Sequence, residues 1–349
     1  MRVLVTGSEG YIGSQLTPLL RAREHEVVCL DAGFYNERSL YSLNGNGSST
    51  PFIRKDIRHI NEDDLRGVDA VVHLAELSND PLGQLNPEIT YQINHQGSVA
   101  LARMAKRAGV ARFVYTSSCS VYGAGSGDIK TEESETDPQT AYAECKVLVE
   151  RDVSALADDD FSPTFLRNAT AYGPSPHMRF DLVLNNLSGL AWTTREIRMT
   201  SDGTPWRPLV HVLDICEAIA NVLEAPRELV HNEVFNVGDS KENYRVREIA
   251  EVVAESFPGC DLSFGSSDGD NRSYRVSFEK IHRTLPGFRC RRSVRTGAEE
   301  LREIFERIGL TTDLFQYRTF TRLKQLQHLL NTGQLDAQLF WAPLTVPQI

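Results

Sequence analysis

The chain has 349 residues and a formal net charge of −10. This length allows a large core and predicts two lobes. The acidic balance argues against a broad nucleic-acid or membrane surface, because such surfaces need basic patches. The six cysteines form no CxxC pair, so neither a disulfide framework nor a metal site is expected. With no signal-peptide pattern and no membrane-length apolar run, the sequence predicts a cytoplasmic protein.

Short runs rich in β-branched residues alternate with helical patterns along most of the chain. Near-continuous apolar runs of this kind are typical of parallel strands that are buried on both faces. The predicted strands cover residues 2–7, 26–31, 69–75, 112–118, 163–168 and 234–239. Predicted helices lie at 11–23, 92–108 and 141–156, and Pro18 is expected to kink or shorten the first. The alternation predicts an α/β fold with a Rossmann-type, doubly wound parallel sheet.

Strict alternation weakens after about residue 174, where a helix is predicted over 179–192. We therefore expect a Rossmann domain over 1–173 with a return near 207–240, and a smaller, interrupted substrate-binding lobe over 174–206 and 241–300. Residues 301–349 read as a C-terminal helical extension. In it, Phe320, Leu323, Leu326 and Leu330 share one helical face, which is expected to pack on its own domain.

Glycines at 7, 10 and 13 follow the first predicted strand and open the first predicted helix. Gly7 permits a tight turn, Gly10 lets a pyrophosphate approach the backbone, and Gly13 lets helix and strand pack closely. The phosphates would lie at the helix N-terminus, where amide groups and the helix dipole favour anions. The pattern predicts a dinucleotide site.

Acidic residues at two strand ends refine this site. Asp31 ends the second strand and can accept hydrogen bonds from the adenosine ribose, and it would repel a 2′-phosphate. NAD is therefore favoured over NADP. Asp56 and Ile57 are placed to meet the adenine.

Tyr142 and Lys146 are four residues apart and share a helical face. A tyrosine is a poor base at neutral pH, but a lysine cation one turn away and a positive nicotinamide ring stabilise its phenolate. Such a tyrosine can take a proton from a sugar hydroxyl as hydride leaves the carbon. Ser118, at a strand end in the same sheet, can hydrogen-bond the same oxygen.

With these motifs, the chain resembles the extended short-chain dehydrogenases/reductases, in the branch of NAD-dependent nucleotide-sugar epimerases and dehydratases. The resemblance covers roughly residues 1–290 and does not include the tail. The motifs that carry it are GSEGYIG, HLAELSNDP, Asn94, TSSCSVYG, YAECK, RNATAYGP and PWRPLVHVLDI.

The resemblance implies a catalytic triad of Ser118, Tyr142 and Lys146, and a dimer formed through the helices at 92–108 and 141–156. It also implies a set of NAD-binding residues: Gly7, Gly10, Tyr11, Ile12, Gly13, Asp31, Asp56, Ile57, Leu74, Ala75, Asn94, Tyr142 and Lys146.

The substrate implied by the resemblance is a nucleoside-diphosphate sugar. In the family an asparagine and two arginines hold its diphosphate, and a guanidinium suits this task because its geometry matches that of a phosphate. The arginines of this chain that match are Arg207 and Arg272. Either Asn185 or Asn186 matches the asparagine. Ser120 and Asn168 complete the expected substrate contacts.

Cys119 and Ser120 stand where nucleotide-sugar 4,6-dehydratases carry an aspartic acid and a glutamic acid. A cysteine can exchange a proton, but a serine is a poor replacement for a glutamate base. The cysteine of GDP-mannose 3,5-epimerases aligns one residue later, at Ser120. Cys119 is therefore interpreted first as a small residue shaping the pocket, and second as an acid or base. Glu76, where the family has a small residue, is a candidate for the missing base if it faces the pocket.

The sequence favours an NAD-dependent nucleotide-sugar epimerase that acts at C4, with Tyr142 as base. Within enzymes, the alternative is a dehydratase or 4-ketoreductase of a deoxysugar route that uses Cys119 and Glu76. A non-catalytic NAD-responsive regulator is a remote alternative, because such proteins tend to lose the Tyr and Lys pair. The sequence assigns no nucleotide, no sugar and no role for residues 301–349.

Overall fold

The computed structural model describes residues 1–42, 50–124, 127–266 and 273–343. Its centre is a seven-stranded sheet in the order β11-β7-β5-β4-β1-β2-β3, and every neighbouring pair is parallel. The strands are β1 (Arg2–Thr6), β2 (Glu26–Asp31), β3 (Phe52–Arg54), β4 (Ala70–His73), β5 (Arg112–Ser118), β7 (Ser162–Asn168) and β11 (Glu233–Val237). The six predicted strands and the doubly wound α/β class are confirmed, and β3 is an additional short edge strand.

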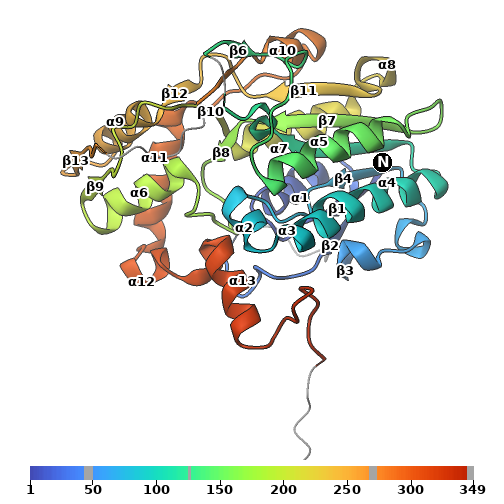
Figure 1. The fold of residues 1–349 in the computed structure, drawn as a ribbon, viewed down its shortest axis with the longest axis horizontal. Helices are drawn as coiled ribbons and strands as arrows, with labels where there is room; N and C mark the ends of the chain where they lie inside the picture. The colour runs from blue at the N-terminus through green and yellow to red at the C-terminus, as the bar shows by residue number, and fades with distance from the viewer. Residues whose placement is uncertain (43–49, 125–126, 267–272, 344–349) are drawn as a thin grey trace, which may run out of the picture.

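Helices cover both faces of this sheet because alternate strand residues point to opposite sides. Around the sheet lie the helices α1 (Gly13–Ala22), α2 (Asp80–Leu85), α3 (Pro87–Thr90), α4 (Ser98–Arg107), α5 (Ala141–Ser154), α7 (Val212–Glu224), α8 (Arg227–Val230) and α10 (Glu279–Thr284). Val3 and Val5 pack with α1 and α7, whereas Leu4 packs with α4 and α5. Figure 1 shows α2 to α5 side by side along one side of the sheet.

The smaller lobe has its own apolar core, formed by α6 (Val183–Thr193), α9 (Val246–Ser256) and α11 (Val294–Ile308). Three small sheets lie outside the main sheet. They pair β12 (Asn243–Arg245) and β8 (Thr170–Tyr172) with β10 (Trp206–His211), β13 (Asp261–Ser263) with β9 (Glu196–Arg198), and β14 (Arg275–Val276) with β6 (Ile129–Lys130). The boundary expected at residue 301 falls inside α11.

Three helix predictions need correction. Pro18 lies inside α1, which continues to Ala22 because Leu16 and Leu20 are buried against the sheet. The helix predicted over 92–108 is a π-helical segment at 91–97 followed by α4, so its hydrogen-bond pattern changes at residue 98. The helix predicted from 179 starts at Val183, because the backbone of Leu182 is extended (φ −93, ψ 139) and not helical.

The C-terminal segment folds back onto the main domain. After α11 come α12 (Thr312–Phe315) and α13 (Arg322–Asn331), and α13 packs against α2 with Leu326 and Leu329 buried. Packing of this helix on its own chain is as expected. Figure 1 shows the red segment below the strands, beside α2. Within the described residues, no helix has the length and apolar character needed to cross a membrane.

Candidate active site

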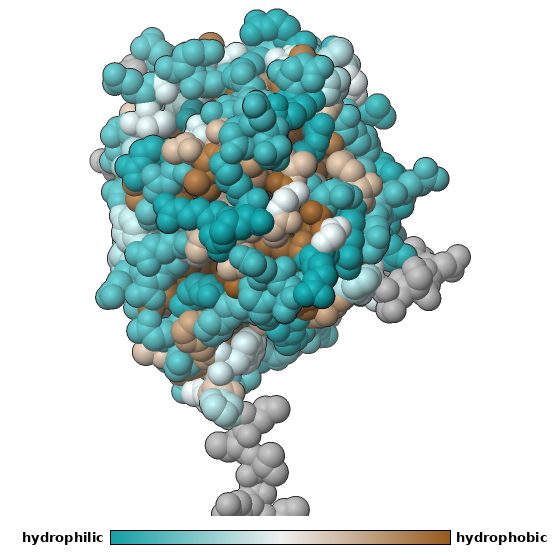
Figure 2. Space-filling view, turned by 90° about the vertical axis from the view of Figure 1, so that its right-hand side faces the viewer, coloured by the Kyte–Doolittle hydropathy of each residue, from teal (hydrophilic) through white to brown (hydrophobic). Residues whose placement is uncertain are grey.

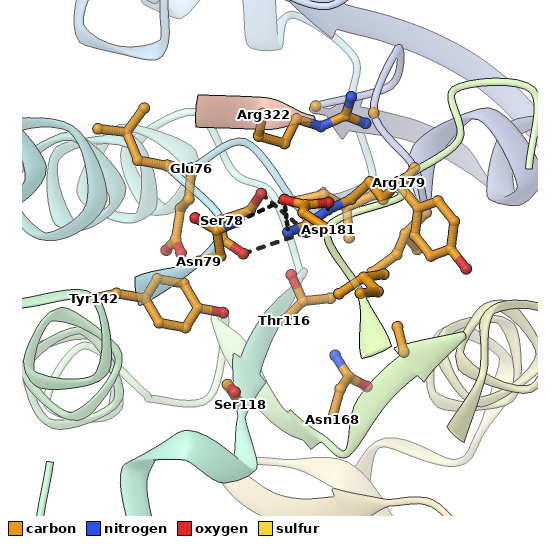
Figure 3. A pocket seen from close by; sticks show the side chains of 18 of the residues that line it. Glu76, Ser78, Asn79, Thr116, Ser118, Tyr142, Asn168, Arg179, Asp181 and Arg322 are labelled. Atoms are coloured by element: carbon orange, nitrogen blue, oxygen red, sulfur yellow. Dashed lines mark hydrogen bonds and ion pairs between the residues drawn. The ribbon is translucent and has the colours of Figure 1, made fainter. Parts of the chain in front are cut away.

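A cavity of about 750 Å³ lies at the carboxyl ends of the sheet strands, between the main domain and the smaller lobe. In open α/β sheets this edge is where ligands bind, because the loops after the strands converge there. Figure 3 shows side chains from several such loops pointing into the cavity, with Tyr142 on one side and Arg179 and Asp181 on the other.

The glycine loop forms one end of the cavity. Gly7 has φ +73, and a Cβ on it would lie 2.8 Å from the Ala75 backbone nitrogen. A Cβ on Gly13 would lie 2.2 Å from the Gly7 carbonyl oxygen, so the start of α1 lies too close to the turn after β1 for any side chain. Gly10, Tyr11 and Ile12 line the cavity between them. The loop therefore presents bare backbone at the N-terminus of α1, which fits the diphosphate of a dinucleotide.

Both acidic residues expected at the adenosine end line the cavity. Asp31 accepts hydrogen bonds from the backbone amides of Gly33 (2.7 Å) and Glu9 (3.0 Å), which orient its carboxylate. Burial raises the pKa of Asp31. Asp56 is held by the guanidinium of Arg58 through bonds of 3.0 and 2.7 Å. Their positions fit the ribose and the adenine of the cofactor.

Tyr142 and Lys146 face the other end of the cavity from one side of α5. The Lys146 ammonium lies 5.4 Å from the centre of the Tyr142 ring and donates a 2.6 Å hydrogen bond to the Thr116 carbonyl. It also forms an ion pair with Glu76, whose side chain is only 2% exposed. The other oxygen of Glu76 accepts a 2.6 Å hydrogen bond from the Tyr115 hydroxyl. The negative charge of Glu76 therefore acts on both Tyr142 and Lys146, and both of its carboxylate oxygens contact protein groups.

These charges set the protonation of the pair. Burial raises the pKa of Tyr142, Lys146 opposes this by stabilising the phenolate, and Glu76 adds to the rise. For Lys146, burial disfavours the ammonium, but the Glu76 carboxylate and Tyr142 together outweigh burial and raise the pKa. Before ligands bind, Tyr142 is therefore a protonated phenol beside a charged lysine. An additional positive charge near the phenol would shift it toward the phenolate.

A buried ion pair anchors α5 to the sheet. Glu150, two turns after Tyr142, accepts hydrogen bonds of 3.0 and 2.7 Å from the Arg167 guanidinium on β7. The Ser117 hydroxyl on β5 donates a further 2.5 Å bond to the same carboxylate. The residues at 142, 146 and 150 share a helical face, so this network also fixes the direction in which Tyr142 points.

Polar atoms without protein partners lie at this end of the cavity. Ser118, Ser120 and Asn168 line it, and the Ser120 hydroxyl and the Asn168 carbonyl oxygen are buried with no hydrogen-bond partner among the described residues. The Ser118 hydroxyl accepts a 3.1 Å bond from the Ser120 amide, which orients it. Buried polar groups without partners are costly, so these atoms fit a polar ligand such as a sugar.

Some residues assigned from the sequence lie elsewhere. Cys119 does not line the cavity: its thiol is 1% exposed, packs in the core and contacts the Arg167 carbonyl at 3.2 Å. Cys119 begins the tight helical turn that follows β5, Cys119–Tyr122, and in this turn the Cys119 thiol is directed to the core, whereas Ser118 and Ser120 reach the cavity. Burial raises the pKa of the Cys119 thiol, which further disfavours proton exchange.

The two asparagines proposed for the diphosphate also do not line the cavity. Asn185 accepts from the Gly173 amide and donates to Tyr11, and Asn186 donates to the Phe180 carbonyl. Both brace the segment that enters α6. Asn94 likewise braces the loop after β4, through two bonds to the Leu77 backbone. Leu74 and Ala75, from that loop, line the cavity together with Arg207, whereas Arg272 lies outside the described residues.

Sequence reasoning missed a charged wall opposite Tyr142. Arg179 makes a two-pronged ion pair with Asp181 (3.0 and 3.1 Å) and donates to Ser78, and Asn79 donates to Asp181 at 2.7 Å. Arg322, from the C-terminal extension, lines the same wall (Figure 3). The local sequence signal of this wall is the pair of charged residues in the RFD motif, residues 179–181, which stands next to an apolar stretch. No local signal points to Arg322, which reaches the wall only when the chain folds.

Together the parallel sheet, the bare glycine loop and the Tyr142–Lys146 pair define an enzyme that moves hydride between a dinucleotide and a substrate. A family model described as the NAD dependent epimerase/dehydratase family matches residues 3–238, and the chain belongs to this family.

Relatives of the chain act on nucleotide sugars. The chain is 27% identical over 308 residues to UDP-glucuronic acid decarboxylase 4 of Arabidopsis thaliana, covering 85% of this chain and 67% of the plant protein. It is 28% identical over 312 residues to UDP-glucose 4-epimerase of Lactobacillus helveticus, covering 83% of this chain and 92% of the bacterial protein. The solved structure of MoeE5 in complex with UDP-glucuronic acid and NAD is 30% identical, with a TM-score of 0.76, covering 88% of this chain and 99% of that one. The chain is an NAD-dependent enzyme that modifies nucleotide sugars.

Proposed function

We propose that this enzyme is a nucleotide-sugar epimerase that inverts C4 of the sugar through a 4-keto intermediate. The observation that carries the proposal is that the carboxylates near Tyr142 are already bonded to other protein groups. The two carboxylates that act on the pKa of Tyr142 are Glu76 and Asp80. Glu76 is held by Lys146 and Tyr115, and Asp80 accepts a 2.6 Å hydrogen bond from the Thr140 hydroxyl. Elimination of water needs a base beside the ketone, whereas inversion at C4 needs only Tyr142 and hydride transfer.

In this proposal some residues of the chain transfer the proton, and others bind the cofactor and the substrate. When bound, NAD supplies the acceptor for the C4 hydride and gives it back. Tyr142 takes the C4 hydroxyl proton and returns it to the oxygen after the sugar has turned over in the cavity. Ser118 orients that hydroxyl, and Lys146 stabilises the phenolate. The glycine loop and Asp31 hold the cofactor, while Ser120 and Asn168 offer hydrogen bonds to the sugar and Arg207 offers a cation to its diphosphate.

The experiment is NMR of the purified enzyme in D₂O with a panel of nucleoside-diphosphate hexoses. Epimerisation at C4 gives a product inverted at C4 with no deuterium on carbon, because the hydride leaves and returns without exchange. Deuterium at C3 or C5 of a product that keeps all six carbons, or a deoxy signal, contradicts the proposal and makes Glu76 and Asp80 candidate bases again.

Tyr142→Phe tests the role of the base. Turnover is expected to fall to the detection limit while NAD stays bound, because the variant lacks the proton-accepting oxygen and keeps the ring. Tyr91→Phe is a matched control, since its hydroxyl bonds Glu144 and it does not line the cavity. Near-normal turnover by Tyr142→Phe would refute the mechanism.

A second candidate is decarboxylation of a nucleotide-linked uronic acid. It is supported by the decarboxylase relative and by the structure that holds UDP-glucuronic acid. Oxidation at C4 places a ketone β to the carboxylate, so the C5–C6 bond can break to release CO₂ without a protein base. The electron pair of that bond forms an enolate, C5 then takes a proton, and the hydride returns to C4. A nucleoside-diphosphate hexuronic acid added to the NMR panel distinguishes this reaction, because its product lacks C6 and carries deuterium at C5.

We also propose a homodimer formed through α4 and α5. Figure 2 shows hydrophobic residues near the middle of a mostly hydrophilic face, on the side where α4 lies in Figure 1. Light scattering coupled to gel filtration tests it: a mass of about twice 39.1 kDa is expected, and the mass of a monomer would refute it.

A further inference from the structure

The C-terminal extension forms part of the cofactor cavity wall. Thr321, Arg322 and Leu323, at the start of α13, line the cavity. Downstream, the Gln325 amide donates a 3.1 Å hydrogen bond to the Phe34 carbonyl, and the Trp341 indole donates a 2.7 Å bond to the Ala32 carbonyl. The segment therefore holds the loop that follows β2, where the adenosine end of the cavity begins.

Arg322 is a buried cation without a carboxylate partner. Its side chain is 2% exposed, and its guanidinium donates to the carbonyls of Thr319 and His177, both at 3.0 Å. It lies 4.4 Å from the centre of the Tyr35 ring. No ion pair between Arg322 and a carboxylate occurs within the part of the chain that the structure describes. The neighbouring Arg179, in contrast, is neutralised by Asp181 through two bonds.

The charge on Arg322 is correspondingly costly. Burial lowers its pKa to about 10, and repulsion by Arg179 adds to the effect, whereas Asp181, Tyr35 and Asp31 oppose it. Buried charges in proteins are normally paired. A buried arginine that faces a ligand cavity beside a second arginine is therefore stabilised when an anionic ligand enters.

Its surroundings indicate which anion this is. Arg322 acts electrostatically on Asp31, the residue at the end of β2, and stacks on the loop that follows it. The bare glycine loop, also next to Asp31, receives the diphosphate of the cofactor. We propose that Arg322 binds a phosphate of the bound dinucleotide, so that the C-terminal extension is a component of the NAD site. A guanidinium suits this task because its fork matches phosphate oxygens.

The test is NAD binding rather than turnover, so it is independent of which sugar reaction the enzyme performs. The variant is Arg322→Gln, and Lys324→Gln is the matched control, since Lys324 is exposed on the same helix. Calorimetry on cofactor-stripped protein measures NAD, ADP-ribose, adenosine and UDP. Loss of one charge-assisted contact is expected to weaken NAD and ADP-ribose about tenfold or more. Adenosine, which carries no phosphate, is expected to bind both proteins equally.

Three results would overturn the proposal. Unchanged NAD affinity would show that Arg322 does not bind the cofactor. Equal weakening of adenosine would show that it only shapes the loop. A loss confined to UDP would place the anion on the sugar nucleotide. Should Arg322→Gln fail to fold, Arg322→Lys decides, because a lysine keeps the charge and loses the fork. NAD affinity below that of the wild type with unchanged adenosine affinity supports the proposal, and wild-type NAD affinity overturns it.

Discussion

Replacing Glu76 by Gln tests how the proton-transfer pair is tuned. The change removes one negative charge, keeps the shape of the side chain and leaves an oxygen for the Tyr115 hydroxyl. Glu76 raises the pKa of both Tyr142 and Lys146, so its loss lowers both. Because the proposed base is the phenolate, the acid limb of the kcat/KM profile is expected to move toward lower pH. The alkaline limb, where Lys146 loses its proton, is expected to move the same way.

The size of the effect follows from the geometry. The Lys146 ammonium is 5.4 Å from the centre of the Tyr142 ring and touches the Glu76 carboxylate. The carboxylate is therefore within about 8 Å of the ring, and at an effective dielectric constant of about 20 the two charges interact by roughly 2 kcal/mol. Below the pKa of Tyr142, the variant is expected to hold roughly ten- to thirtyfold more phenolate than the wild type.

The assay is an ultraviolet difference titration of tyrosinate, from which the same titration of a Tyr142→Phe protein is subtracted in each background. Circular dichroism establishes that Glu76→Gln is folded. Glu242→Gln serves as the control, because Glu242 is a partly buried carboxylate that accepts from the Val294 amide in the smaller lobe. A Tyr142 titration that stays in place or moves to higher pH would refute the electrostatic reasoning.

Two further predictions concern residues around the cavity. Cys119→Ala is expected to keep turnover within about threefold and to lose about 1–2 kcal/mol of stability in urea unfolding, because the thiol only fills the core; a hundredfold loss of turnover in the folded variant would restore an acid–base role. Glu150→Gln is expected to lower the free energy of unfolding by about 3–5 kcal/mol, because Arg167 stays buried without its partner. An unchanged unfolding curve would show that this pair does not stabilise α5.

The sequence by itself determined the local features of the site. Six of the seven parallel strands are short apolar runs, so the strand pattern predicted the sheet and its class. The glycine spacing needs only a strand, a turn and a helix, all within thirteen residues. Tyr142 and Lys146 meet because of helical periodicity alone. These features depend on neighbours in the chain, and hydrophobic and helical periods report such neighbours directly.

Only the tertiary structure decided the partners of these residues. Glu76 meets Lys146 across seventy positions, and this contact makes it an electrostatic partner rather than a free base. Cys119 turns to the core because the chain leaves β5 through a tight helical turn, which no periodicity predicts. Arg322 reaches the cavity from the last tenth of the chain because α13 buries its leucines against the main domain. Contacts over such separations are set by the packing of whole elements, and single-sequence patterns carry no record of them.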